Sequence, residues 1–124
     1  MAWLGNWRNQ YGSVVAITDE ADGAIRGWFE TVLEDSGFHG QRAEILGIHR
    51  GNCIAFAATA RGPAGDMVVS YTGLLRDGRM ETLWHYAADT AIAAKPGEPG
   101  RVEQVPWWRA MITSADTFVR DGDA

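Results

Sequence analysis

The chain consists of short segments in which apolar and polar residues alternate, and glycine-rich turns separate these segments. Alternation with a period of two is typical of half-buried β-strands, and the period of about 3.6 residues that marks a helix is nearly absent. Turn chemistry is explicit at residues 12–13, 21–23, 50–52, 62–65 and 77–78, which are rich in Gly, Asp, Asn and Pro. We predict eight strands, at about residues 5–11, 13–18, 24–33, 42–49, 52–60, 67–75, 79–88 and 110–119.

Eight strands joined mostly in sequence predict an all-β fold, an antiparallel up-and-down β-barrel, because closure removes exposed sheet edges. A barrel of this size is just wide enough for one small ligand. The 124 residues suit a single domain, which we expect to span residues 1–124. The longest connection, residues 89–106, is predicted to be a loop, and Trp107-Trp108 to form a single helical turn.

Strand alternation also predicts which side chains face the barrel interior. Most of the inward positions form an ordinary core: Trp7 and Tyr11; Gly27 and Phe29; Phe56, Ala58 and Ala60; Met67, Val69 and Tyr71; Met80, Thr82, Trp84 and Tyr86; Ile112 and Phe118. The polar exceptions are Asn9, Ser13, Thr31, Ser114 and Asp116. Because an unpaired buried polar group costs roughly 1–3 kcal/mol, these side chains must bind either one another or a ligand.

Charge and composition exclude several classes of partner. The formal net charge is -5 and the Lys and Arg residues are scattered, so we expect no nucleic-acid partner. No apolar run approaches the ~20 residues of a membrane helix, and the start of the chain lacks the features of a signal peptide, so we expect no membrane partner. Cys53 is the only cysteine, which leaves no internal disulfide and an open redox compartment.

Metal and catalytic motifs are weak in this sequence. His49 and Cys53 are four residues apart across a turn, but no second pair accompanies them, so we predict no zinc site. Asp116 and Ser114 have no histidine base in any motif, and neither a nucleophile elbow nor a phosphate loop is present. We therefore predict that the protein is not an enzyme.

Five segments resemble the avidin/streptavidin family, and together they extend along nearly the whole chain. They are "GNWRNQYGS" at 5–13, "ADGAIRGWFET" at 21–31, "YTG" at 71–73, "TLW" at 82–84 and "WRAMITSADTF" at 108–118. The first and last are the most specific, since they carry Trp-x-Asn-x-x-x-Ser and a Trp eight residues before Asp-Thr-Phe. The resemblance implies a barrel that binds biotin as its ligand, with no cofactor and no catalysis.

The resemblance further implies how the ureido group of biotin is bound. Asn9 and Ser13 match two residues that donate hydrogen bonds to the ureido carbonyl, and Phe29 stands where the family has a third donor, a Tyr. Thr31 and Asp116 match the residues that accept from the ureido N–H groups. A charged acceptor opposite a polarised urea forms a strong hydrogen bond.

Aromatic residues complete the implied site. Trp84 and Tyr71 match aromatic walls around the bicyclic ring, and Trp108 matches a Trp that a neighbouring subunit contributes. This match implies a homo-oligomer, with a tetramer favoured. Dimeric relatives commonly lack that Trp and brace a loop with a disulfide, which the single Cys53 cannot form.

The chain departs from the family at the end of the site that receives the carboxylate tail of biotin. A wall Trp becomes Ala60, the hydroxyl facing the ligand sulfur becomes Val69, and a hydroxyl near the tail becomes Met67. Asp35 takes the position of a loop residue near the tail and would repel a carboxylate. The side chains that can fill the gap at Ala60 are Phe38, Phe56 and Tyr86. We therefore expect weaker biotin binding than in streptavidin.

Two alternatives stay open at this stage. The same barrel can serve another small cyclic ligand, which the altered tail end favours. It can also be a ligand-free scaffold in which Met67, Met80 and Tyr86 fill the interior. The family resemblance favours a secreted or periplasmic protein if a leader has been removed, and a cytoplasmic one if the chain is complete.

Overall fold

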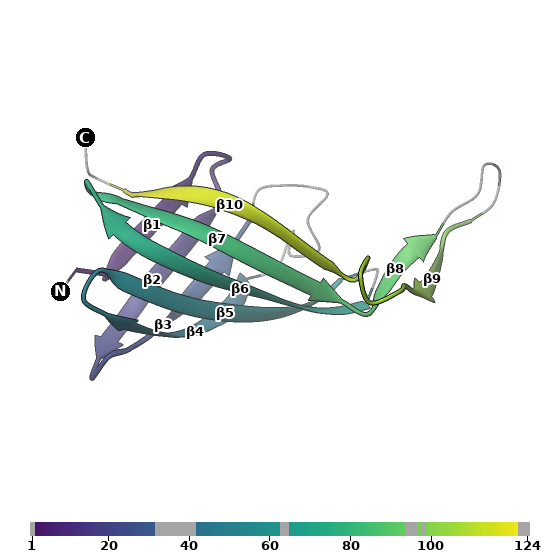
Figure 1. Cartoon of the computed structure of the whole chain (residues 1–124), viewed down its shortest axis with the longest axis horizontal. Helices are drawn as coiled ribbons and strands as arrows, with labels where there is room; N and C mark the ends of the chain where they lie inside the picture. The colour runs from purple at the N-terminus through teal and green to yellow at the C-terminus, as the bar shows by residue number, and fades with distance from the viewer. Residues whose placement is uncertain (1, 32–41, 63–64, 94–96, 98, 122–124) are drawn as a thin grey trace.

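The computed structural model describes residues 2–31, 42–62, 65–93, 97 and 99–121. Eight strands close into an antiparallel barrel in the order β1-β10-β7-β6-β5-β4-β3-β2, so the predicted up-and-down barrel is confirmed (Figure 1). The barrel strands are β1 (Gly5–Asn9), β2 (Val14–Ala21), β3 (Ala24–Glu30), β4 (Arg42–Arg50), β5 (Cys53–Gly62), β6 (Gly65–Arg76), β7 (Arg79–Ala88) and β10 (Met111–Arg120). No helix among the described residues is long and apolar enough to cross a membrane.

The prediction of a structureless loop at 89–106 is wrong. Strand β8 (Thr90–Ala93) pairs with β9 (Arg101–Gln104) in a separate two-stranded sheet that projects beyond the barrel (Figure 1). The two short strands contain the β-branched residues Thr90, Ile92 and Val102, which favour β-structure. The Ala, Gly and Pro content of the whole segment is typical of a loop, so the pattern was not recognised. The helical turn predicted at Trp107-Trp108 is present, since the N–H groups of Arg109 and Ala110 donate to the Pro106 carbonyl.

Tryptophan side chains close one end of the barrel. Trp3 and Trp7 are each 1% exposed, and the Trp7 indole N–H donates to the Trp3 carbonyl over 2.9 Å. The guanidinium of Arg120 lies 4.5 Å from the centre of the Trp7 ring. The Trp3 N–H donates to the carboxylate of Glu20 over 3.1 Å. We call this the closed end of the barrel, and we call the opposite end, where β1 runs into β2, the open end.

Two glycines allow the strands to coil tightly around the core. A Cβ on Gly27 would meet the Ala16 carbonyl oxygen at 1.8 Å, and one on Gly47 would meet the Ala55 carbonyl oxygen at 2.3 Å. Both glycines occupy inward positions of their strands, where only the absence of a side chain permits this approach. Substitution of either residue by Ala therefore requires the backbone to move.

Three residues predicted to face the core are exposed. Tyr11 is 58% exposed because β1 ends at Asn9 and the chain turns at once. Ile112 is 53% exposed and Ser114 is also exposed. Strand β1 pairs with β10 only at residues 118–120, so the first half of β10 runs along β7 without a strand on its other side.

Candidate functional site

The polar inward residues gather at the open end of the barrel. Asn9 ends β1, Ser13 precedes β2, Thr31 follows β3, and Asp116 lies within β10. All four side chains are buried. Asn9 pairs with Phe118 across the β1–β10 ladder, so Asp116 lies two residues beyond the end of β1, beside the turn that leads into β2.

Two side-chain amides hold the carboxylate of Asp116. Gln10 Nε2 donates to one oxygen over 3.1 Å and Asn9 Nδ2 donates to the other over 3.4 Å. The Thr82 hydroxyl donates to the Asp116 backbone carbonyl over 2.8 Å, which fixes the strand at this point. Burial raises the pKa of Asp116 above its ordinary value, and the groups around it, the two amides and the Trp84 indole, lower the pKa partway back. Among the described residues no cation forms an ion pair with this carboxylate.

The amide of Asn9 has a fixed orientation. Its Oδ1 accepts from the backbone N–H groups of Tyr11, over 3.0 Å, and Ser13, over 2.9 Å. These bonds make the tight turn, and they leave Nδ2 as the group that faces Asp116. The hydroxyls of Ser13 and Thr31 lie 2.9 Å apart in a hydrogen bond. The polar residues therefore bind one another, and they still present donors and an anionic acceptor to the interior.

An aromatic cluster lies next to this polar group. The ring of Tyr71 stacks on Phe56, with centroids 4.9 Å apart and planes at 16°. It also contacts the rings of Trp84, Phe29 and Phe118 at centroid distances of 6.4, 6.3 and 5.9 Å. The indole Nε1–H of Trp84 is buried and lies near Asp116, but outside hydrogen-bond geometry, and it has no partner in the described parts of the chain.

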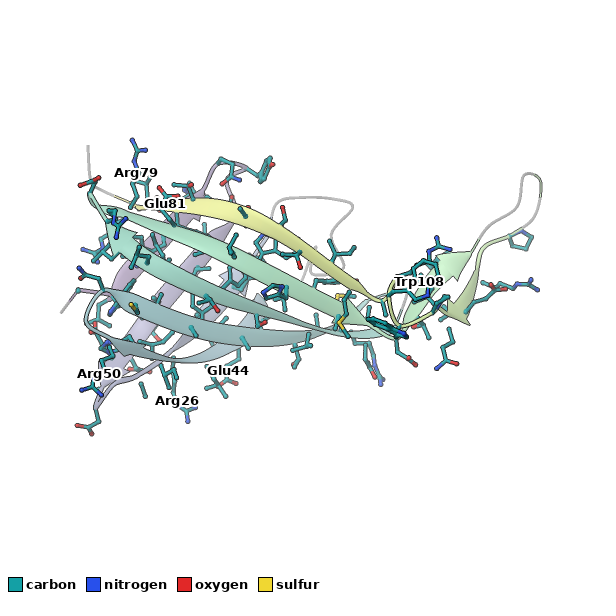
Figure 2. The ribbon with its side chains drawn as sticks, viewed as in Figure 1. Arg26, Glu44, Arg50, Arg79, Glu81 and Trp108 are labelled. Atoms are coloured by element: carbon teal, nitrogen blue, oxygen red, sulfur yellow. The ribbon has the colours of Figure 1, made fainter. Side chains whose placement is uncertain are left out.

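The structure brings most of the predicted site residues together, but not all of them. Val69 is buried on the inner face of β6, two residues from Tyr71, and Tyr86 is half-buried on β7. Trp108 is 63% exposed and lies at the end that carries the β8–β9 hairpin (Figure 2). Asp35 lies outside the described residues.

Sequence reasoning missed one residue of the site. Strand alternation through 5–11 directs Gln10 away from the interior, but the strand ends at Asn9 and Gln10 belongs to the turn. Its amide bridges two elements, because Nε2 donates to Asp116 and Oε1 accepts from the Thr117 N–H over 3.1 Å. The Asn-Gln-Tyr-Gly sequence carries a signal for this turn, since Asn side chains commonly accept from the backbone two residues later.

The remaining ionisable residues give no sign of metal binding. No group of three or more His, Cys, Asp or Glu side chains that could hold a metal ion occurs in the described ranges. Cys53 is exposed and free.

Comparisons with known proteins agree on one family. The model of the Avidin family matches residues 1–121. Among solved structures, the rhizavidin–biotin complex is 19% identical with a TM-score of 0.70, and the match covers 98% of this chain and 93% of that one. Apo shwanavidin is 17% identical with a TM-score of 0.70, covering 98% of both chains. Apo bradavidin2 is 17% identical with a TM-score of 0.68, covering 94% and 95%. A search of curated sequences finds no match.

Proposed function

This chain belongs to the avidin family, and on that premise we propose that it binds biotin, without catalysis, at the open end of its barrel. Family membership and the similar structures that are biotin complexes, those of rhizavidin and bradavidin2, support this proposal. The single observation that carries it is the buried carboxylate of Asp116, held by two amides and bordered by aromatic rings.

The polar and aromatic side chains at the open end of the barrel are suited to bind a cyclic urea. A urea offers two N–H donors and one carbonyl acceptor within a small planar group. The carboxylate of Asp116 and the hydroxyl of Thr31 accept from the N–H groups, and Asn9 Nδ2 and the Ser13 hydroxyl donate to the carbonyl. The rings of Trp84 and Tyr71 enclose the apolar face of the bicycle. These groups are already ordered by the hydrogen bonds among them, so binding costs little reorganisation.

The inner face of β5 and β6 is apolar toward the mouth of the barrel. Ala58, Met67 and Val69 are buried there, and none of them carries a cation or a hydroxyl that could bind a carboxylate. The valerate tail of biotin therefore leaves the site along an apolar wall. Asp35, which we predict to lie near the tail, adds negative charge.

The proposed function is tested by titrating the protein with biotin and with biotin methyl ester. We expect one ligand per chain, and we expect the ester to bind as tightly as free biotin or more tightly, because the described residues at the tail end offer the carboxylate no favourable partner. Displacement of a fluorescent biotin measures both affinities at low and high salt. No displacement by either ligand would exclude the function, and a strong preference for free biotin would place a cation at the tail.

A second candidate is a different small cyclic ligand in the same barrel. The apolar tail end of the site favours this second candidate, because the described residues there include no polar group that would make the site selective for the free carboxylate of biotin. A thermal-shift screen of cyclic ureas, lactams and imides separates the two candidates, since a ligand that binds only the folded state raises the melting temperature.

We also propose that Trp108 is covered by a second copy of the chain in a homo-oligomer, with a tetramer favoured. Large apolar side chains are exposed around the projecting hairpin: Ile92, Val102, Trp107, Trp108, Met111 and Ile112. Labelled charged residues such as Arg79 and Glu81 lie toward the other end of the molecule (Figure 2). An isolated two-stranded hairpin is marginally stable in water, so a partner that covers these exposed apolar side chains would stabilise it.

Trp108→Lys is expected to lower both the oligomeric order and the biotin affinity. A lysine in a desolvated interface is costly, and loss of a buried interface Trp commonly costs 2 kcal/mol or more, which is roughly 30-fold in affinity. Light scattering at micromolar concentration measures the mass, and ligand displacement measures the affinity. Trp28→Lys is the control, because Trp28 is exposed on the outer face of β3. A wild-type monomer under these conditions would contradict the proposal.

A further inference from the structure

The side chain of Gln10 takes the place of a strand residue beside Asp116. The β1–β10 ladder ends at the pair Asn9–Phe118. At the next position of β10, the backbone N–H of Thr117 donates to Oε1 of Gln10 over 3.1 Å rather than to a main-chain carbonyl. The side-chain amide of Gln10 therefore serves as the peptide group that β1 would have supplied if it had continued.

The other end of this amide is aimed at the carboxylate of Asp116. Nε2 donates to Oδ1 of Asp116 over 3.1 Å. An amide is planar, so fixing its oxygen on the Thr117 N–H also fixes the direction of its N–H groups. Gln10 is itself exposed, so this hydrogen bond reaches the buried acid from the edge of the barrel and leaves the interior for a ligand.

Gln10 makes the shortest side-chain contact to this carboxylate. The bond from Asn9 Nδ2 is longer, at 3.4 Å, and the proposed function also assigns this Nδ2 to the carbonyl of the ligand. The indole N–H of Trp84 lies outside hydrogen-bond geometry. A carboxylate has about four lone-pair sites on its two oxygens, so Asp116 can accept from Gln10 and from a ligand N–H together.

Ionisable groups packed around Asp116 give its negative charge no support. Among the described residues no cation forms an ion pair with it. Tyr71 on β6 stays protonated, because burial raises its pKa. On the outer face, Glu81 accepts from a hydroxyl of β10, and Arg8 is paired with another acid. The side chains at the start of β2 and the end of β3 are hydroxyls, so amides are the groups that stabilise the charge.

We propose that Gln10 is a positioning residue whose amide keeps Asp116 ionised and oriented toward the ligand, and thereby sets the lowest pH at which the protein binds its ligand. The inference rests on the proposed function and deepens it. Burial raises the pKa of Asp116, and the hydrogen bond from Gln10 opposes that rise because a donor favours the charged form. Without this amide the carboxyl group takes up a proton at a higher pH, and a protonated carboxyl is a poorer acceptor for the ligand N–H.

The first test compares Gln10→Met with the wild-type protein. Methionine keeps the length of the side chain and removes the amide. Biotin methyl ester is the ligand, because it has no ionisable carboxylate and the pH dependence of its binding then comes from the protein. We expect the variant to bind more weakly, and we expect its loss to grow by roughly 2- to 12-fold between about pH 8 and pH 5, the range for one hydrogen bond.

A second variant separates the two contacts of the amide. Gln10→Glu keeps an oxygen that can accept from the Thr117 N–H, but it places a second carboxylate opposite Asp116. Two carboxylates at one site cannot both stay ionised, so this variant should lose more affinity near neutral pH than Gln10→Met. Asn6→Met is the matched control, because Asn6 is an exposed amide on the outer face of β1 and should leave the pH profile unchanged.

A readout without ligand follows the acid directly. Carbon NMR of the Asp116 carboxyl group in the apo protein measures its titration, and Asp116→Asn identifies the resonance. The midpoint should move to higher pH in Gln10→Met and stay in place in Asn6→Met. A residue that only holds the backbone of β10 would not move it in this direction.

Each outcome decides the matter. A loss of affinity in Gln10→Met that is equal at every pH, or an unmoved carboxyl midpoint, would overturn the inference and leave the proposed function intact. A wild-type pH profile in Gln10→Glu would overturn it as well. If the wild-type protein binds neither biotin nor its methyl ester at any pH, the proposed function fails, and the inference fails with it.

Discussion

Biotin is expected to bind this protein with a dissociation constant of about 1 pM to 10 nM, two to six orders of magnitude weaker than the tightest known biotin complexes. Ala60 in place of a wall Trp removes up to ~200 Å² of contact, which is worth about 2–5 kcal/mol. Val69 and Met67 each replace a polar contact, at roughly 0.5–1.5 kcal/mol. The sum is about 3–8 kcal/mol relative to a reference near 10⁻¹⁴ M.

The same argument predicts a gain of affinity. Ala60 is partly buried beside Met67 at the mouth of the barrel, so Ala60→Trp should restore a wall and tighten binding by roughly one to three orders of magnitude. Competition with a fluorescent biotin, together with the dissociation rate, measures the change. Thr59→Trp is the control, because Thr59 is exposed on the outer face of the same strand. Femtomolar binding by the wild type would show that Phe56 or Tyr86 already supplies the missing wall.

Asp116→Ala is expected to weaken biotin binding by roughly 10- to 150-fold, which corresponds to the 1.5–3 kcal/mol of a hydrogen bond to a charged group. Asp116→Asn should cause at least a similar loss, because the amide lacks the charge that strengthens the bond to the urea and its NH2 group faces one of the two donating amides of Asn9 and Gln10. Asp121→Asn is the control, since Asp121 is an exposed acid that pairs with Arg8 at 3.0 Å outside the site. Unchanged affinity in a folded Asp116 variant would remove this residue from the site.

The pH dependence follows from the raised pKa of Asp116. Because the folded state holds this proton more tightly than the unfolded chain, the contribution of Asp116 to apo stability is present at low pH and is lost as pH rises through the raised pKa. Biotin binding has the opposite sign, since it uses the carboxylate, and should weaken as pH falls through the same pKa. Between about pH 4 and 7, the contribution of Asp116 to the melting temperature of the apo protein should therefore fall as pH rises, whereas the biotin affinity should rise. In Asp116→Asn both trends should flatten.

The local pattern of the sequence was sufficient for the barrel itself. Period-two alternation and turn residues act over a few positions, so they predicted the eight barrel strands and their order. The same alternation placed Asn9, Thr31 and Asp116 inward, and all three are buried. These positions were predictable because a strand has only two faces, and the apolar neighbours of each polar residue reveal which face is buried.

Local pattern also had clear limits. Tyr11 and Ile112 continue an alternating pattern and are nevertheless exposed, because β1 ends at Asn9 and leaves the first half of β10 uncovered. The β8–β9 hairpin escaped prediction since its strands of four residues are short and the residues between them are typical of loops.

The sequence by itself therefore determined the fold class and the face on which each polar residue of the site lies. Only the tertiary structure decided which of these residues meet. Gln10 and Asp116 are 106 residues apart, and their contact depends on where β1 stops against β10. Likewise, Tyr71 contacts Phe29 and Phe118 only because closure brings non-adjacent strands across one interior. Alternation fixes the side of a strand, but closure and register fix which residues are neighbours, and the chemistry of the site depends on those neighbours.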